Sequence, residues 1–363
     1  MRYAHCSTLL VAANGRAMKS VVKLFKDLTA DELSEQLSIP LRLARRLQAY
    51  VVRKGAADLP RELPEVSPKV LARLRDEAHV PHLALLEKVV SPRDGFAKYL
   101  FRGQGDEPFE AVRIPLLHRE DDPKYVVCVS SQVGCALACS FCATGRMGFR
   151  RNLETWEIVD QVVKVQADSE HPVRGVVFMG MGEPLLNYDR VMRAAAIFSE
   201  PCGLAISAKS ISISTAGVVP GIHRFTAERR PYRLVVSLTS ADPDKRRELM
   251  PIESTYPLPE LMAAVREHQA ATGTRIMLAW TAISGVNTSA QDARQLAALT
   301  AGLPIKLDLI DVNDATGQFQ PPSDSELANF RDVLRQHLAM PVVRRYSGGQ
   351  DIQGGCGMLA GLG

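Results

Sequence analysis

Apolar and polar positions along this chain form a regular alternation of short apolar segments and longer amphipathic ones. From residue 125 onward, runs rich in β-branched residues alternate with segments of helical periodicity. The predicted strands are 125–131, 173–179, 211–215, 233–238, 275–281, 305–310 and 341–345. The predicted helices are 154–168, 189–199, 242–249, 258–271, 289–301 and 324–338. Repeated strand–helix units imply parallel strands joined by right-handed crossovers, so we expect an α/β fold.

The number of these units limits the architecture. About six units are too few to close an eight-stranded barrel, so we predict a partial, open (β/α)6 barrel. The residues before it show short helical segments and then a hairpin. We therefore divide the chain into a leader that we expect to be disordered, a helical accessory domain, a linking hairpin and the core: 1–17, 18–95, 96–124 and 125–363.

Local signals mark the starts of several elements in the first part of the chain. Thr29 and Glu32 have the spacing of a capping box, and Ser67 followed by Pro68 is typical of a helix start. Two apolar runs, 99–101 and 109–114, flank a Gly-rich turn and predict the hairpin.

Composition excludes some classes of protein. The chain has 363 residues, 46% hydrophobic and 23% charged, with a net charge of +4, which is ordinary for a globular protein. No apolar run reaches the roughly 18 residues of a membrane span. Seven Cys, four of them within 128–142, do not resemble a disulfide framework and fit a reducing cytoplasm.

A run of basic residues in the accessory domain is the clearest charge feature. No Asp or Glu occurs from Leu41 to Ala57, while the same stretch contains several cations: Arg42, Arg45, Arg46, Arg53 and Lys54. A solvated helix face is the ordinary explanation for such a run. A small basic module ahead of a larger domain also fits RNA binding, which is our prediction.

Three cysteines follow the first core strand with the spacing C-x3-C-x2-C: Cys135, Cys139 and Cys142. A loop this short can bring three thiolates to one inorganic cluster. A 4Fe–4S cluster usually takes four Cys ligands, so three ligands leave one iron open to a substrate. The alternative is a zinc loop, but a zinc ribbon needs a second ligand pair, and the sequence shows none at similar spacing.

The cysteine loop resembles the radical-SAM superfamily and, more closely, its RlmN/Cfr branch of RNA adenosine methyltransferases. The spacing marks the superfamily, and the flanking stretches 129–135 and 148–153 mark the branch. The resemblance covers about residues 20–360. It implies the radical-SAM partial barrel, a 4Fe–4S cluster, S-adenosylmethionine (SAM) as cofactor, and methylation at C2 of adenosine in 23S rRNA and in tRNA.

The positions that bind SAM in the branch have counterparts at four predicted strand ends. They are Gly182, Glu183, Ser214, Ser237, Leu238, Thr239 and Asn313. By this resemblance Glu183 binds the ammonium group of SAM. Thr239 stands where the family has His, the turn after Asn313 is altered, and Met358 replaces a Gln. These departures leave open a related enzyme with another substrate.

Two further cysteines and one carboxylate match the catalytic residues of the branch. Cys356, in a Gly-rich segment, resembles the methyl-carrying Cys, and Cys128 resembles the second catalytic Cys. Glu110, in the pattern Glu-x-Val-x-Ile-Pro, matches the proton-accepting Glu. The implied relay methylates Cys356, joins its carbon to adenine, and releases the product when Cys128 attacks the Cys356 sulfur. The two Cα atoms must then come within about 4.4–6.8 Å.

Two other functions remain open from the sequence. One is methylation at C8, the Cfr-like activity that confers antibiotic resistance. The other is an RNA-binding iron–sulfur redox or sensor protein, which would leave Cys128, Cys356 and Glu183 without a role. We expect RNA as the substrate, an external electron donor such as flavodoxin or ferredoxin, no membrane association and a monomer. Cys6 and Cys202 match nothing in the family, and we expect both to be structural.

Overall fold

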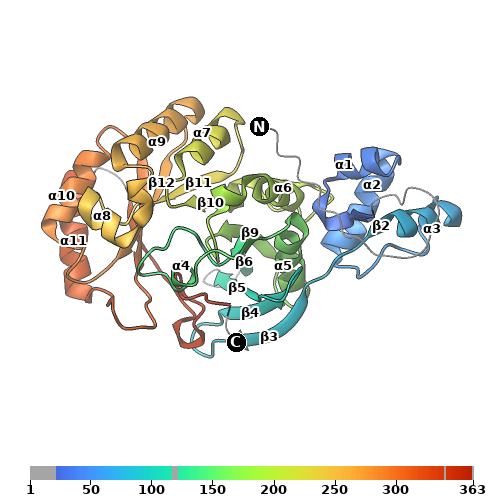
Figure 1. Cartoon of the computed structure of the whole chain (residues 1–363), viewed down its shortest axis with the longest axis horizontal. Coiled ribbons are helices and arrows are strands. Elements are labelled where there is room, and N and C mark those ends of the chain that lie inside the picture. The colour runs from blue at the N-terminus through green and yellow to red at the C-terminus, as the bar shows by residue number, and fades with distance from the viewer. Residues whose placement is uncertain (1–21, 117–121, 339–340, 362–363) are drawn as a thin grey trace.

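A mixed ten-stranded sheet runs through the molecule and carries its larger helices (Figure 1). The computed structural model describes residues 22–116, 122–338 and 341–361. The predicted leader 1–17 and Cys6 lie outside the described residues. The strand order is β14-β13-β12-β11-β10-β9-β6-β5-β4-β3, so the sheet is open, with β14 and β3 at its edges.

The parallel part of the sheet begins at β6, and its strands pair in chain order. Its members are β6 (Lys124–Cys128), β9 (Val173–Phe178), β10 (Ile211–Thr215), β11 (Arg233–Ser237), β12 (Ile276–Ala282), β13 (Ile305–Asp311) and β14 (Val342–Arg345). All the predicted core strands are confirmed. The first ends at Cys128, earlier than predicted, which places that cysteine at the carboxyl end of β6.

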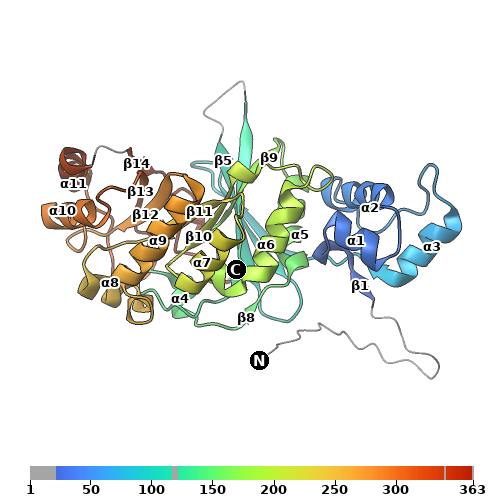
Figure 2. The ribbon, with the colours of Figure 1, turned by 90° about the horizontal axis from the view of Figure 1, so that it is seen from above.

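Each parallel strand before β14 is followed by at least one helix, and the helices succeed one another along the sheet from α5 to α11 (Figure 2). They are α5 (Thr155–Ala167), α6 (Tyr188–Ser199), α7 (Val219–Ala227), α8 (Pro243–Leu249), α9 (Leu258–Thr272), α10 (Ala290–Leu299) and α11 (Asp324–His337). The sequence analysis missed α7. Its first residues include Pro220 and Gly221, which usually break helices, but a Pro in the first turn removes no helical hydrogen bond.

The predicted hairpin is present as β4 (Ala97–Arg102) and β5 (Phe109–Leu116), and it extends the main sheet. β5 pairs antiparallel with β6, and a further strand, β3 (Ala84–Val90), forms the edge. The prediction of a helical accessory domain over 18–95 is wrong for residues 84–90, which form β3. Its side chains are mostly exposed, so it shows little of the alternation that identifies a half-buried strand.

The accessory helices lie beside α5 and α6 at one end of the molecule (Figure 1). They are α1 (Ala30–Gln36), α2 (Leu41–Gln48), a π-helical turn (Ala49–Arg53) and α3 (Pro68–Glu77). The capping box is confirmed: the Glu32 amide donates to Thr29 Oγ1 at 3.3 Å, and the Thr29 amide donates to Glu32 Oε2 at 2.9 Å. Ser67 caps α3.

Several short elements complete the described fold. They are β1 (Lys23–Leu24), β2 (Ala78–His79), β7 (Gln132–Val133), β8 (Arg151–Asn152), α4 (Ala143–Arg146), and 3-10 turns at Phe25–Asp27, Pro184–Asn187, Ala208–Ser210, Pro251–Ser254 and Gln350–Ile352. No helix in the described part of the chain combines the length and apolar character that crossing a membrane requires.

Candidate active site

A cavity of about 170 Å³ opens at the carboxyl ends of the parallel strands, and we call it the central cavity. This is the edge where α/β proteins place their ligands. The sequence-predicted residues that line it are Cys135, Cys139, Cys142, Gly182, Glu183, Ser214, Ser237, Thr239, Asn313 and Cys356. The structure therefore brings together nearly all of the predicted site. The exceptions are Cys128, Glu110 and the buried Leu238.

The loop with the three cysteines is held by backbone hydrogen bonds to several other segments. The Cys135 amide donates to the Gly148 carbonyl at 3.1 Å, and the Ser140 amide donates to the Leu249 carbonyl at 3.0 Å. The Ala143 amide, at the start of α4, donates to the Gly357 carbonyl at 2.7 Å. The loop is thus fixed to the end of α8 and to the segment that contains Cys356.

The three thiols face one cavity and influence one another electrostatically. Burial raises the pKa of Cys135 to about 12, and the charges of Glu183 and Cys142 add to this rise. Burial also raises the pKa of Cys139, with further contributions from Cys142 and Cys135. Buried thiolates need a positive partner, which iron supplies.

The three cysteine thiols that line the central cavity are the donors that an iron–sulfur cluster takes. Among the described residues, no three His, Cys, Asp or Glu side chains gather closely enough to hold one metal ion. In a 4Fe–4S cube each thiolate binds a different iron, so its ligands stand further apart than those of zinc. The three cysteines and the cavity between them fit that larger group.

Glu183 is a buried carboxylate at the turn after β9. Its Oε2 accepts from the Ala216 amide at 2.9 Å, and its Oε1 accepts from the Leu185 amide at 3.0 Å. Burial raises its pKa to about 7, and these amide hydrogen bonds oppose the rise only in part. A cationic group in the cavity would stabilise the charged form, as the ammonium of SAM would.

Gly182 allows the turn before Glu183 to pass close to the cysteine loop. Its φ is +97°, and a Cβ there would lie 2.5 Å from Gln132 Cβ and 2.8 Å from the Gln132 amide nitrogen. The Glu183 amide donates to Gln132 Oε1 at 2.8 Å. Only Gly can take this conformation at this distance from its neighbour.

Three hydroxyl residues of the central cavity come from the ends of β10 and β11. Ser214 Oγ and Ser237 Oγ are 3.3 Å apart, so the two hydroxyls share a hydrogen bond. Thr239 has a φ of +59°, and its buried hydroxyl lacks a hydrogen-bond partner among the described residues. A buried hydroxyl without a partner is costly, so a polar ligand in this cavity fits the site.

The side chain of Asn313, just after β13, is hydrogen-bonded to the segment that contains Cys356. Its Nδ2 donates to Ser347 Oγ at 2.8 Å and to the Cys356 carbonyl at 3.3 Å. The Cys356 amide in turn donates to Ser347 Oγ at 3.1 Å. The sequence analysis did not identify Ser347, because nothing in the chain signals a contact between two loops.

Cys128 and Cys356 line a second, smaller cavity of about 80 Å³, which we call the Cys128 cavity. Cys356 lines both cavities, as do its neighbour Gly357 and the cysteine-loop residue Cys142. Burial raises the pKa of Cys128 to about 12, the Cys356 thiol adds to the rise, and Arg345 opposes it. Two residues 228 positions apart in the sequence thus line one cavity, and both are free thiols.

Glu110 lines neither cavity. It is buried in β5, where its Oε1 is 2.9 Å from Lys98 Nζ. Its Oε2 accepts from the amides of Ala360 and Gly361 at 2.8 and 3.0 Å. The carboxylate therefore binds the C-terminal segment, four residues beyond Cys356. To accept a proton from a substrate, it would first have to leave these partners.

Arg345 is the site residue that sequence reasoning missed most clearly. It is the last residue of β14 and lines the Cys128 cavity. Its position at the end of a predicted core strand was the available signal, because side chains at that edge face the site.

The chain is similar to proteins of known family over almost its whole length. A model described as the radical SAM superfamily matches residues 129–281. A probable RNA methyltransferase of Myxococcus xanthus is 50% identical, over 92% of this chain and 93% of the relative. The dual-specificity RNA methyltransferase RlmN of Syntrophobacter fumaroxidans is 41% identical, over 92% of this chain and 97% of the relative. The crystal structure of a radical SAM methyltransferase from Sphaerobacter thermophilus is 35% identical and superposes with a TM-score of 0.85, covering 94% of this chain and 100% of that one.

Proposed function

Because this chain belongs to the RlmN-like family of radical SAM RNA methyltransferases, we propose that it methylates C2 of adenosine. The proposed substrates are 23S rRNA and tRNA, as the dual-specificity relatives suggest. The observation that carries the proposal is that Cys356 lines both the central cavity and the Cys128 cavity. One sulfur can therefore take a methyl group on one side and present it to a nucleobase on the other.

The family implies SAM and a 4Fe–4S cluster, which together supply a methyl group and one-electron chemistry. We propose that Cys135, Cys139 and Cys142 ligate the cluster. Glu183 would pair with the ammonium of SAM, and the hydroxyl of Thr239 would find a polar partner on it. The Ser214–Ser237 pair and the backbone at Gly182 complete the proposed SAM contacts: the first offers hydroxyls and the second a close backbone approach.

In the proposed relay the chain itself holds the carbon during transfer. The Cys356 sulfur receives the methyl group. When its carbon later bonds to the adenine ring, the S-methyl group gives up one hydrogen and the ring carbon gives up its proton, and the one-electron chemistry of SAM and the cluster would supply the accompanying redox change. The Cys128 thiolate then attacks the Cys356 sulfur. The carbon–sulfur bond breaks, its electron pair takes up a proton to complete the product methyl group, and a Cys128–Cys356 disulfide remains. A thiol reductant must reduce that disulfide before the next cycle. Burial disfavours the Cys128 thiolate, and the guanidinium of Arg345 offsets part of that cost.

We propose that Glu110 holds the C-terminal segment in place. Its contacts to Lys98, Ala360 and Gly361 support this role directly. The sequence suggested Glu110 as the base for the ring proton, and that role requires a state in which the segment has released it. The two roles predict different behaviour of a Gln variant, as described below.

One contact across the sheet supports a curved arrangement of the parallel strands. We propose that the parallel strands curl into a partial (β/α)6 barrel, because Arg345 of β14 contacts Met179, directly after β9, although β10 to β13 separate these strands in the sheet. We further propose that the accessory helices bind RNA, that an electron donor such as flavodoxin or ferredoxin reduces the cluster, and that the enzyme acts as a cytoplasmic monomer.

Nucleoside mass spectrometry tests the reaction itself. RNA from cells with and without the gene is digested and compared. We expect C2-methyladenosine to disappear with the gene. The appearance of C8-methyladenosine instead would support the Cfr-like alternative. No change in any modified adenosine would favour a protein that binds RNA without modifying it.

Replacing Cys139 by Ala tests the ligand assignment. We expect the variant to lose the visible absorption of the reconstituted cluster and to contain little iron. Cys202→Ala is the matched control, since Cys202 lies far from the cavity and contacts Gln48. A full iron content in Cys139→Ala would overturn the assignment.

Replacing Cys128 by Ala tests the release step. Without the attacking sulfur, the RNA should stay covalently bound through Cys356. We expect a protein–RNA adduct that survives denaturing electrophoresis and disappears in the Cys128→Ala/Cys356→Ala double variant. Recovery of free Cys128→Ala protein after turnover would contradict the proposed release.

A further inference from the structure

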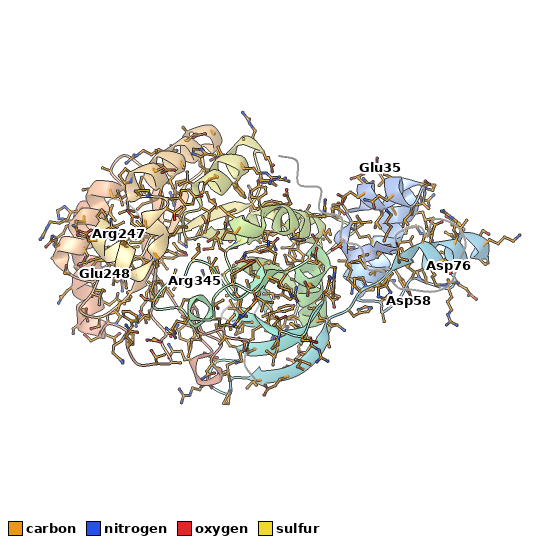
Figure 3. All side chains as sticks on the ribbon, in the orientation of Figure 1. Glu35, Asp58, Asp76, Arg247, Glu248 and Arg345 are labelled. Atoms are coloured by element: carbon orange, nitrogen blue, oxygen red, sulfur yellow. The ribbon has the colours of Figure 1, made fainter. Side chains whose placement is uncertain are left out.

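Arg345 has an environment that the proposed relay does not explain. Among the described residues that line the Cys128 cavity, it is the only charged one. Its Nη1 lies 3.3 Å from Met179 Sδ, and within the described part of the chain no carboxylate pairs with it. The preceding residue, Arg344, is bound instead by Asp311 and Asp324. In Figure 3 Arg345 lies in the middle of the molecule, while Arg247 and Glu248 lie toward one side.

A guanidinium of this kind needs a better partner than a thioether. It carries five N–H donors, and the Met sulfur is only a weak acceptor. Arg345 is half-buried, so water replaces the missing partner incompletely. The rest of the cavity lining is free of Asp and Glu, so an anion that enters meets no opposing charge. Planar guanidinium groups bind phosphate in two parallel hydrogen bonds.

The next residue, Tyr346, offers a fixed aromatic surface at the same cavity. Its side chain is 71% exposed, the largest exposure among the large hydrophobic residues described. Its hydroxyl donates to Asp94 Oδ2 at 2.9 Å, and its ring packs against the ring of Phe96 at a centroid distance of 6.1 Å. These contacts hold the ring in place while much of its surface stays open. Unpaired RNA bases stack on such rings.

We propose that Arg345 and Tyr346 form a nucleotide-binding subsite at the mouth of the Cys128 cavity. The Arg345 guanidinium binds a backbone phosphate of the nucleotide whose base enters the cavity, and the Tyr346 ring stacks on an adjacent unpaired base. The subsite rests on the proposed function, because it assumes an RNA substrate. It adds a binding contact that is independent of the cluster, SAM and the two cysteines.

Equilibrium binding of a short RNA hairpin with an unpaired adenosine in its loop tests this subsite. Affinity is measured by fluorescence anisotropy at several salt concentrations, without SAM. We expect Arg345→Ala to weaken binding about ten-fold and to lower the slope of log K against log salt by about one, as for one lost phosphate contact. Tyr346→Ala should also weaken binding about ten-fold, with an unchanged slope, and Tyr346→Phe should bind like the wild type.

Arg335→Ala is the matched control, because this exposed residue of α11 carries the same charge and pairs only with Asp332. It should bind RNA like the wild type. If Arg345→Ala bound the RNA with unchanged affinity and slope, the proposed subsite would be overturned, even if the variant bound SAM less tightly. The proposed function is judged separately, by nucleoside analysis. If the variant loses affinity but the wild type forms no methyladenosine, the subsite stands and the function fails.

Discussion

Single buried polar residues decide what the central cavity can bind and how the C-terminal segment beside it is held. Three such residues are almost completely buried: Glu183, Thr239 and Glu110. Each has a polar side-chain atom whose hydrogen-bond partner affects stability or binding. Glu183 is held by amides, Thr239 lacks a partner among the described residues, and Glu110 is bound to the C-terminal segment. Because a buried polar atom is costly unless satisfied, each of these residues gives a measurable prediction.

The raised pKa of Glu183 predicts a pH-dependent stability of the protein without SAM. Its ordinary value is 4.5 and its folded value is about 7, so the folded state holds an extra proton between them. The stabilisation is complete below the ordinary value and is lost as the pH rises through the folded value. We therefore expect Glu183→Gln to gain roughly 3 kcal/mol relative to the wild type between about pH 4 and about pH 8, measured by urea unfolding. A difference for Glu183→Gln that does not change with pH would contradict the burial argument.

Replacing Glu110 by Gln separates a holding role from a catalytic one. The Gln amide would face the ammonium of Lys98, donor to donor, and leave that buried charge unpaired. We expect a loss of about 3 kcal/mol in unfolding free energy. Hydrogen exchange at the Ala360 and Gly361 amides should become faster. Lys98→Met/Glu110→Gln should recover part of the loss. Full stability together with lost methylation would instead indicate a base.

At the scale of elements, tight turns between strand and helix position the site. The turn after β9 needs Gly182, and the cysteine loop needs its backbone bonds to Gly148, Leu249 and Gly357. These contacts are made between protein atoms, so they constrain the loop that carries the three proposed ligands. Such preorganisation lowers the entropy that binding must overcome.

Gly182→Ala should therefore damage both stability and the site. The left-handed backbone and the contact with Gln132 together should cost about 3–5 kcal/mol. Gly273→Ala is the matched control, because Gly273 also has a positive φ but has nothing within 4 Å of a Cβ. It should cost about 1 kcal/mol. Differential scanning calorimetry compares the two; equal losses would show that the contact with Gln132 is unimportant.

Buried strands were easier to predict from the sequence than exposed ones. The core strands are β-branched and buried, so their pattern identified them, and the helices between them were predicted from their helical periodicity. β3 and α7 escaped for local reasons: one is an exposed edge strand and the other begins with Val-Pro-Gly. The spacing of Cys135, Cys139 and Cys142 alone predicts them as cluster ligands. The partners of Glu110 could not be, because they lie 250 and 251 positions away.

At the scale of the whole molecule, a buried ion pair joins the accessory part to the core. Lys26 and Asp160 of α5 are both completely buried, with Nζ and Oδ1 2.6 Å apart. Lys26 also donates to the Pro81 carbonyl at 2.9 Å, and Asp160 accepts from the Leu83 amide at 2.7 Å. Burial lowers the pKa of Lys26, and Asp160 opposes this effect. Nothing in the sequence around Lys26 or Asp160 indicates that the two residues pair, so this ion pair was not predictable.

Breaking this pair should loosen the whole protein. Lys26→Met leaves the Asp160 carboxylate buried without a counter-charge, which should cost about 3–5 kcal/mol. The double variant Lys26→Met/Asp160→Leu should recover much of the loss, since it removes both charges. Chemical denaturation measures both. If the single and double variants were equally unstable, the stabilisation would come from the packing of the two side chains and not from their opposite charges.

The position of Cys356 between two cavities has a consequence for chemical labelling. Because Cys356 lines both the central cavity and the Cys128 cavity, we expect a reagent to reach its thiol from either one. A small alkylating reagent blocked on one route can still arrive by the other. Filling either chamber alone should therefore slow the labelling of this residue only partly, and complete protection should require both occupants together.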